Sequence, residues 1–95
     1  MTVAGQIGLK NFKSKAISTT NTSLKDIVEK DIITSFPNNL SFVCGIISNA
    51  AGTHNFWGHL YAIGSAFYGI INIQLLGNTK IHSLKVENSV ATEAS

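Results

Sequence analysis

The sequence predicts a small, mainly α-helical membrane protein, in which an amphipathic helix is followed by a helical hairpin or by a single transmembrane helix. Residues 32–79 contain no Asp, Glu, Lys or Arg, whereas about a quarter of the residues of an ordinary domain are charged. Residues 56–76 are mostly apolar, and a helix of that length crosses a hydrocarbon core of about 30 Å. With 95 residues and a mean hydropathy of +0.21, the chain forms one domain at most.

The composition also excludes several classes of function. The net charge is only +2 and the chain has no Arg, so it lacks the clustered basic side chains of a nucleic-acid-binding surface. Cys44 is the single cysteine, which excludes an internal disulfide and a cysteine-rich metal site. The His residues have no Asp, Glu or Cys close in sequence at the spacing of metal ligands, and no nucleophile motif is present. We therefore expect no enzymatic activity, no cofactor, no metal site and no nucleic-acid partner.

An amphipathic helix is predicted over residues 23–36. Ser23 followed by Asp26 is the signature of a capping box, with Asp in place of the preferred Glu. Pro37 ends the segment. The apolar residues lie on one stripe of the helix: Leu24, Ile27, Val28 and Ile32. This stripe either packs on a neighbouring element or lies flat at the membrane surface.

The segments at the two ends of the chain are polar. Residues 1–22 are expected to be irregular, because glycines interrupt a short apolar start and a run rich in Ser and Thr follows. Residues 80–95 form a polar C-terminal tail. Residues 23–79, between these two segments, constitute the predicted helical membrane domain.

The predicted transmembrane helix covers residues 56–76. Aromatic residues cluster at its start, as they do at the boundary between membrane and water, and two lysines follow its end. By the positive-inside rule, those lysines place the C-terminus in the cytoplasm. The side chains expected at the membrane interface are Phe56, Trp57, Tyr61, Lys80 and Lys85.

Residues 40–52 are also apolar, but the segment is too short for an independent span and is expected to be a companion arm of a hairpin. One membrane span and two spans both remain open. Small residues recur at helical spacing on this segment and on the next, and helices in lipid associate along such positions. The predicted helix-packing residues are Gly45, Ser48 and Gly52 on the first segment and Gly58, Ala62, Ser65 and Gly69 on the second. They indicate a multi-copy assembly, a private contact within the hairpin, or strand bulges in a soluble sheet.

The stretch Tyr61-Ala-Ile-Gly-Ser-Ala-Phe67-Tyr-Gly-Ile-Ile, with its polar, Lys-containing exit, carries a resemblance to a known family. It resembles the first membrane helix of small inner-membrane or pilin-like subunits of type IV secretion systems, particularly of the IVB (Dot/Icm- or conjugation-like) branch. That family has a second apolar helix after the loop, whereas residues 78–95 of this chain are polar. The resemblance implies that Gly64, Phe67 and Gly69 pack subunits together.

The favoured function is a non-catalytic structural subunit of a multi-subunit membrane assembly, with secretion or conjugation machinery as the specific candidate. Its expected partners are other protein subunits, copies of itself and the lipid bilayer. Three alternatives remain open. They are a small accessory subunit of a respiratory or photosynthetic membrane complex, a pore former of the holin or bacteriocin kind, and a soluble α+β interaction module in which residues 40–47 and 66–76 form buried strands.

Overall fold

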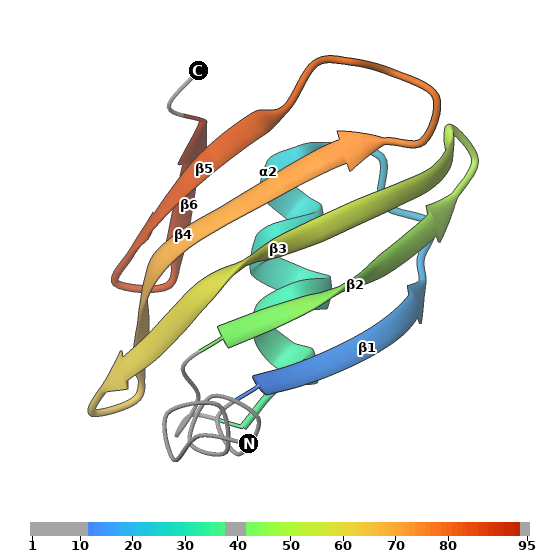
Figure 1. Cartoon of the computed structure of the whole chain (residues 1–95). Coiled ribbons are helices and arrows are strands. Elements are labelled where there is room, and N and C mark those ends of the chain that lie inside the picture. The colour runs from blue at the N-terminus through green and yellow to red at the C-terminus, as the bar shows by residue number, and fades with distance from the viewer. Residues whose placement is uncertain (1–11, 38–41, 94–95) are drawn as a thin grey trace, which may run out of the picture.

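The computed structural model describes residues 12–37 and 42–93, and these residues form six strands and one helix. Its strands form a single sheet in the order β1-β2-β3-β4-β5-β6 (Figure 1). The elements in chain order are β1 (Phe12–Ser18), the three consecutive helical segments α2 (Leu24–Asp26), η1 (Ile27–Ile32) and η2 (Ile33–Ser35), and then β2 (Phe42–Asn49), β3 (Gly52–Ile63), β4 (Ala66–Leu75), β5 (His82–Glu87) and β6 (Val90–Glu93).

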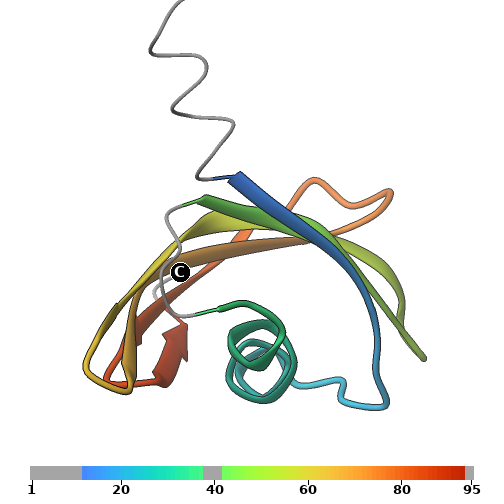
Figure 2. The same ribbon diagram turned by 90° about the horizontal axis from the view of Figure 1, so that it is seen from below.

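The connections determine how the sheet is built. The helix joins β1 to β2, and these two strands run parallel. Each later strand pairs antiparallel with the strand before it, so that β2 to β6 form a meander. The sheet curves around the helix, which lies against its concave face (Figure 2). None of the helices or strands in the described part of the chain covers the convex face.

The helix begins where the sequence predicts it. Ser23 precedes its first residue, and the Ser23 hydroxyl accepts a hydrogen bond from the backbone N–H of Asp26 at 3.5 Å. An α-helical turn leads into a wider π-helical segment and ends in a tighter 3₁₀ turn. Ile27, Val28 and Ile32 are completely buried. The predicted apolar stripe therefore packs against the sheet.

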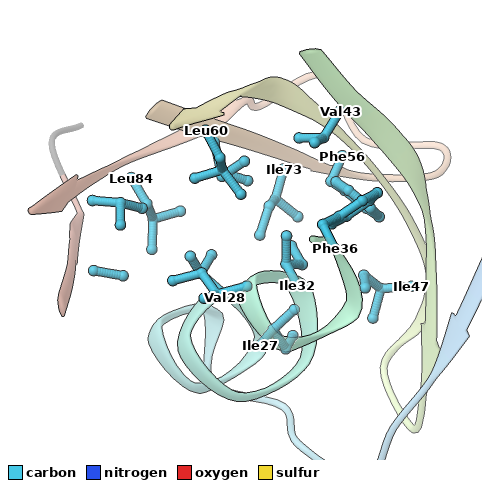
Figure 3. Packing of buried hydrophobic residues seen from close by; sticks show 14 residues of the cluster. Ile27, Val28, Ile32, Phe36, Val43, Ile47, Phe56, Leu60, Ile73 and Leu84 are labelled. Atoms are coloured by element: carbon cyan, nitrogen blue, oxygen red, sulfur yellow. The ribbon is translucent and has the colours of Figure 1, made fainter. Parts of the chain in front are cut away.

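The core lies between this stripe and the concave face of the sheet (Figure 3). Successive side chains of a strand point to opposite faces, so each strand contributes alternate residues to the core. Phe56 is 1% exposed, and its ring meets the ring of Phe36 edge-on, with centroids 6.2 Å apart. The Phe56 ring also lies over Gly45, where a side chain would come within 2.8 Å of it. The large ring of Phe56 thus occupies space that Gly45 leaves free.

Two charged side chains of the helix bind the edge strand β6. The Glu29 carboxylate accepts a hydrogen bond from the backbone N–H of Ala91 at 2.8 Å. Lys25 donates to the carbonyl oxygen of Ala91 at 3.4 Å and also pairs with Glu29. The hydrogen bonds from Lys25 and Ala91 hold the pKa of the Glu29 carboxyl below its ordinary value of 4.5. Side chains of the helix thereby satisfy backbone groups that an edge strand otherwise presents to other chains.

A chain of polar contacts joins β3 to the helix. His54 is buried, and its Nε2 lies 3.1 Å from Oδ1 of Asn49 in β2. The Asn49 amide donates to the carbonyl oxygen of Asn21, and the Asn21 amide donates to the carboxylate of Asp31, each at 3.0 Å. Burial lowers the pKa of His54 below its ordinary value of 6.5. The folded protein therefore favours the neutral form of this imidazole.

We expect the free energy of unfolding to decrease as the pH falls below 6.5. The unfolded chain then protonates His54 before the folded protein does, so stability is lost at a slope of at most about 1.4 kcal/mol per pH unit. Glu29 adds a second loss below 4.5, because its pKa is lowered on folding. Chemical denaturation at a series of pH values measures both losses. His54→Gln should remove the loss between pH 6.5 and 4.5; a loss of unchanged size in this variant would contradict the assignment.

The predictions of a mainly α-helical fold and of a transmembrane helix are wrong. Residues 42–49 form β2, and residues 56–76 contain most of β3, a two-residue turn and the whole of β4. Within the described ranges, no helix has both the length and the apolar character needed to span a membrane. This finding contradicts the predicted membrane localisation, and the positive-inside rule then no longer has a span from which to place the C-terminus. For the α+β alternative, residues 42–47 and 66–75 lie in strands and residue 76 lies in a turn, whereas residues 40 and 41 lie outside the described residues.

The physical reason is that the uncharged strands β2, β3 and β4 build both faces of a sheet. Inward positions carry the apolar residues of the core, and outward positions carry Ser, Thr, Asn, Gln, aromatic and Ile side chains in place of charged ones. The two ends of the chain also differ from expectation. Residues 12–18 of the predicted irregular segment form β1, and the predicted tail contains β5 and β6. Residues 1–11 and 94–95 lie outside the described residues.

Candidate functional site

The convex side of the sheet is the candidate site, and we call it the open face. It consists of the even-numbered residues of β2 and β4 and the odd-numbered residues of β3 and β5, because the residues between them are the ones that point into the core. Its largest exposed side chains, with their exposed fractions, are Phe42 (54%), Ile46 (40%), Tyr61 (47%), Ile63 (63%) and Ile70 (45%). A group of exposed apolar side chains on one face makes that face a candidate interaction site.

The register of the strands aligns four side chains across the middle of the open face. Phe42 of β2 is opposite His59 of β3, His59 is opposite Ile70 of β4, and Ile70 is opposite Lys85 of β5. We call these four residues the central row. The central row brings together residues that are more than forty positions apart in the chain, so no local sequence motif reveals it.

The open face is hollowed along the central row. A groove of about 610 Å³ includes Ile70 in its lining. On one side of Ile70, the rings of Tyr61 and Tyr68 stack with centroids 5.8 Å apart. On the other side, the Ser83 hydroxyl donates to Oδ1 of Asn72 at 2.6 Å. The groove is therefore apolar at its centre, with aromatic and hydrogen-bonding side chains along its sides.

Cys44 lies in a neighbouring hollow of the open face. The hollow measures about 340 Å³ and is also lined by Phe42, Trp57 and His59. Cys44 is opposite Trp57 in the register, and its side chain is half-buried. The thiol therefore lies within the site, next to the central row. Its rate of chemical modification depends on whether this surface is covered.

The open face is almost free of charge. Strands β2, β3 and β4 contain no charged residue. Lys85 and Glu87 stand at its border on β5 and pair with each other at 3.4 Å. Among the residues that the structure describes, no three His, Cys, Asp or Glu side chains gather in a way that could hold a metal ion. The surface is therefore suited to contact with an uncharged, partly apolar partner.

The predicted helix-packing residues lie in strands and turns. A Cβ atom at Gly45, Gly58 or Gly69 would come within 1.9, 2.1 and 2.1 Å, respectively, of a backbone oxygen of a neighbouring strand. These three glycines are explained by close approach of strands. The other four positions are Ser48 on the open face, Gly52 at the start of β3, Ala62 in β3 and Ser65 in the turn that follows.

The predicted membrane-interface residues do not lie together. Successive side chains of β3 point to opposite faces of the sheet and so separate the three aromatic residues among them. Phe56 points into the core, whereas Trp57 and Tyr61 lie on the open face. Lys80 is in the loop before β5, and Lys85 belongs to the central row. The aromatic cluster seen in the sequence is therefore divided between the two faces of one sheet, and an assignment to a single membrane boundary is wrong.

The residues that carry the resemblance to secretion-system subunits lie in the β3–β4 hairpin. Gly64 is in the turn with φ +64°, Phe67 packs against the border of the core, and Gly69 lies against the backbone of His59. Their role in packing subunits stays a prediction. Phe42 belongs to the central row, although it is not among the site residues predicted from the sequence. No protein-family model matches the chain, and comparisons with curated proteins and with solved structures also gave no match.

Proposed function

We propose that the protein is a non-catalytic interaction module that binds another protein through the open face. The observation that carries the proposal is the presence of five large, exposed side chains, four apolar and one tyrosine, on one side of the sheet that is almost free of charge. The expectation of a subunit in a larger assembly persists in this form, without its membrane component.

The chemistry of the open face favours a protein partner over a nucleic acid or a strongly charged peptide. Binding to nucleic acid depends on cationic side chains that neutralise phosphates, and Lys85, the cation of the central row, already faces Glu87. A charged peptide would lose hydration without gaining an opposite charge at the centre of the face. Aromatic and aliphatic side chains around a hollow are instead typical of the central part of protein interfaces.

A capture experiment with three versions of the chain tests this proposal. The wild type, Ile70→Lys and Ile81→Lys are immobilised and exposed to an extract of the cells that produce the protein. Ile81→Lys is a matched control, because Ile81 has the same exposed fraction as Ile70, 45%, but lies in the loop between β4 and β5.

We expect a set of proteins that the wild type and Ile81→Lys retain and that Ile70→Lys retains at least about tenfold less, because a charge is placed in the apolar centre of the interface. Quantitative mass spectrometry of the retained proteins measures the ratio. Equal retention by all three versions would contradict binding through the open face.

A further inference from the structure

We infer that the partner is a second copy of this chain, and that two copies pack open face to open face about a twofold axis. The inference rests on the proposed function, since it names the protein that covers the same surface. Because the sheet curves away from its partner at the sides (Figure 2), the contact is centred on the central row, with Ile70 in the middle strands of the interface.

The absence of charge is what a twofold contact requires. Around a twofold axis the same surface patch meets itself, so residues near the axis face their own copies. A Lys or an Asp in such a position would face an identical charge, which destabilises the pair. Strands β2, β3 and β4 present no such residue. The surface of these three strands is therefore compatible with itself, and Lys85, at the β5 end of the central row, lies away from the axis in such a dimer.

The polar groups of the open face are also compatible with their own copies. His59, Tyr61 and Asn55 each carry both a hydrogen-bond donor and an acceptor, so two copies of the same side chain can bind each other. At the border, Lys85 and Glu87 have opposite charges and lie two residues apart on β5. Each of them can meet the opposite charge of the other copy.

The size of the face sets the expected strength of association. Four strands at a spacing of about 4.8 Å, with about eight residues each at 3.3 Å, give a footprint of roughly 500 Å² per copy. Because the two convex faces diverge at their sides, two copies together bury at most about 1,000 Å², which is the lower limit for a specific interface. We therefore expect a dimer that forms in the micromolar concentration range and dissociates on dilution.

The edges of the sheet are less suited to self-association than the open face. At β6, the backbone N–H and carbonyl of Ala91 already bind Glu29 and Lys25 of the helix. At the opposite edge, β1 carries the exposed residues Lys13 and Lys15, and lysines on an edge strand oppose pairing with another copy. A contact between open faces avoids both obstacles.

Sedimentation equilibrium of the full chain over the micromolar range tests the inference. The wild type should change from a monomer of 10.2 kDa to a species of twice that mass as its concentration rises. Ile70→Lys should raise the dissociation constant at least about thirtyfold, because two lysines then face each other at the axis, whereas Ile81→Lys should leave it unchanged. Circular dichroism shows whether each variant is folded.

The rate of thiol modification of Cys44 provides a second measurement on the wild type. This rate should fall as the protein concentration rises, since the second copy covers the hollow that contains Cys44. A wild type that remains monomeric, with a modification rate independent of concentration, would overturn self-association. If that monomer still captures another protein in an Ile70-dependent manner, the proposed function stands; if it does not, both fail. A dimer unaffected by Ile70→Lys would overturn the assignment to the open face.

Discussion

Gly69→Ala is expected to lower the free energy of unfolding by about 4 kcal/mol, enough to unfold many domains of this size. Gly69 has φ +145°, a backbone conformation that residues with a side chain rarely adopt, and an added Cβ would lie 2.1 Å from the carbonyl oxygen of His59 in β3. That oxygen belongs to the backbone of a central strand, so it cannot move without separating β3 from β4. Urea denaturation followed by circular dichroism measures the change.

Gly64→Ala is the control for this prediction. Gly64 also has a positive φ, +64°, but no atom lies within 4 Å of the position of an added Cβ. The substitution should therefore cost only the conformational strain, about 1 kcal/mol. If Gly69→Ala were no more destabilising than Gly64→Ala, the pairing of Gly69 with Leu60 in the sheet would have to be wrong.

Phe56→Ala is expected to lower the free energy of unfolding by about 3–5 kcal/mol. Phe56 is 1% exposed, and its ring fills the space between Phe36 and Gly45 at the middle of the core. Removal of the ring leaves a cavity, and the paired strands around it are not free to collapse into it. Denaturation in urea again gives the magnitude.

The matched control for Phe56 is Ile63→Ala, at an outward position of the same strand. Ile63 is 63% exposed, so its truncation should change the free energy of unfolding by no more than about 0.5 kcal/mol. Similar effects of the two substitutions would show that β3 does not direct Phe56 inward and Ile63 outward, and would contradict the definition of the open face.

The helix could be predicted from the sequence because its signals are local. Ser23, Asp26 and Pro37 mark its ends within the chain itself, and the apolar stripe has the period of a helix. The structure uses the same residues in the same way. The surface that the stripe packs against could not be predicted, since that surface is assembled from the five strands that follow the helix.

The sequence does not predict the strands, because a long uncharged segment is also typical of a membrane-spanning helix. The alternation of Ile71, Asn72, Ile73 and Gln74 is compatible with a strand, and the structure indeed buries Ile71 and Ile73 while Asn72 and Gln74 point outward. The same pattern is less regular before the turn at residues 64–65, where glycines replace large side chains. A run of apolar and glycine residues has the same composition in a membrane helix and in a sheet, so the length of such a run does not distinguish the two structures.

The sequence indicates that the residues of the open face are uncharged, but it does not indicate their environment. It predicts that Trp57 and Tyr61 lie at a membrane boundary, whereas the structure places them on a face of the sheet that no described element covers. Phe42 and Ile70 could not be linked to them, because the central row exists only after β2, β3 and β4 have paired in register. The position of the central row thus depends on the register between strands and not on any single segment of the chain.

The parallel pairing of β1 with β2 has a consequence for the order of folding. Strands β2 to β6 are joined by short connections, so their contacts close small loops and are expected to form early. Strand β1 pairs with β2 across the whole helical crossover, and it has no partner on its other side in the described sheet. It should therefore dock late and open first, with amide hydrogens that exchange faster than those of β3 and β4. Such a local opening leaves the meander intact, so β1 can detach and pair again while the rest of the domain remains folded.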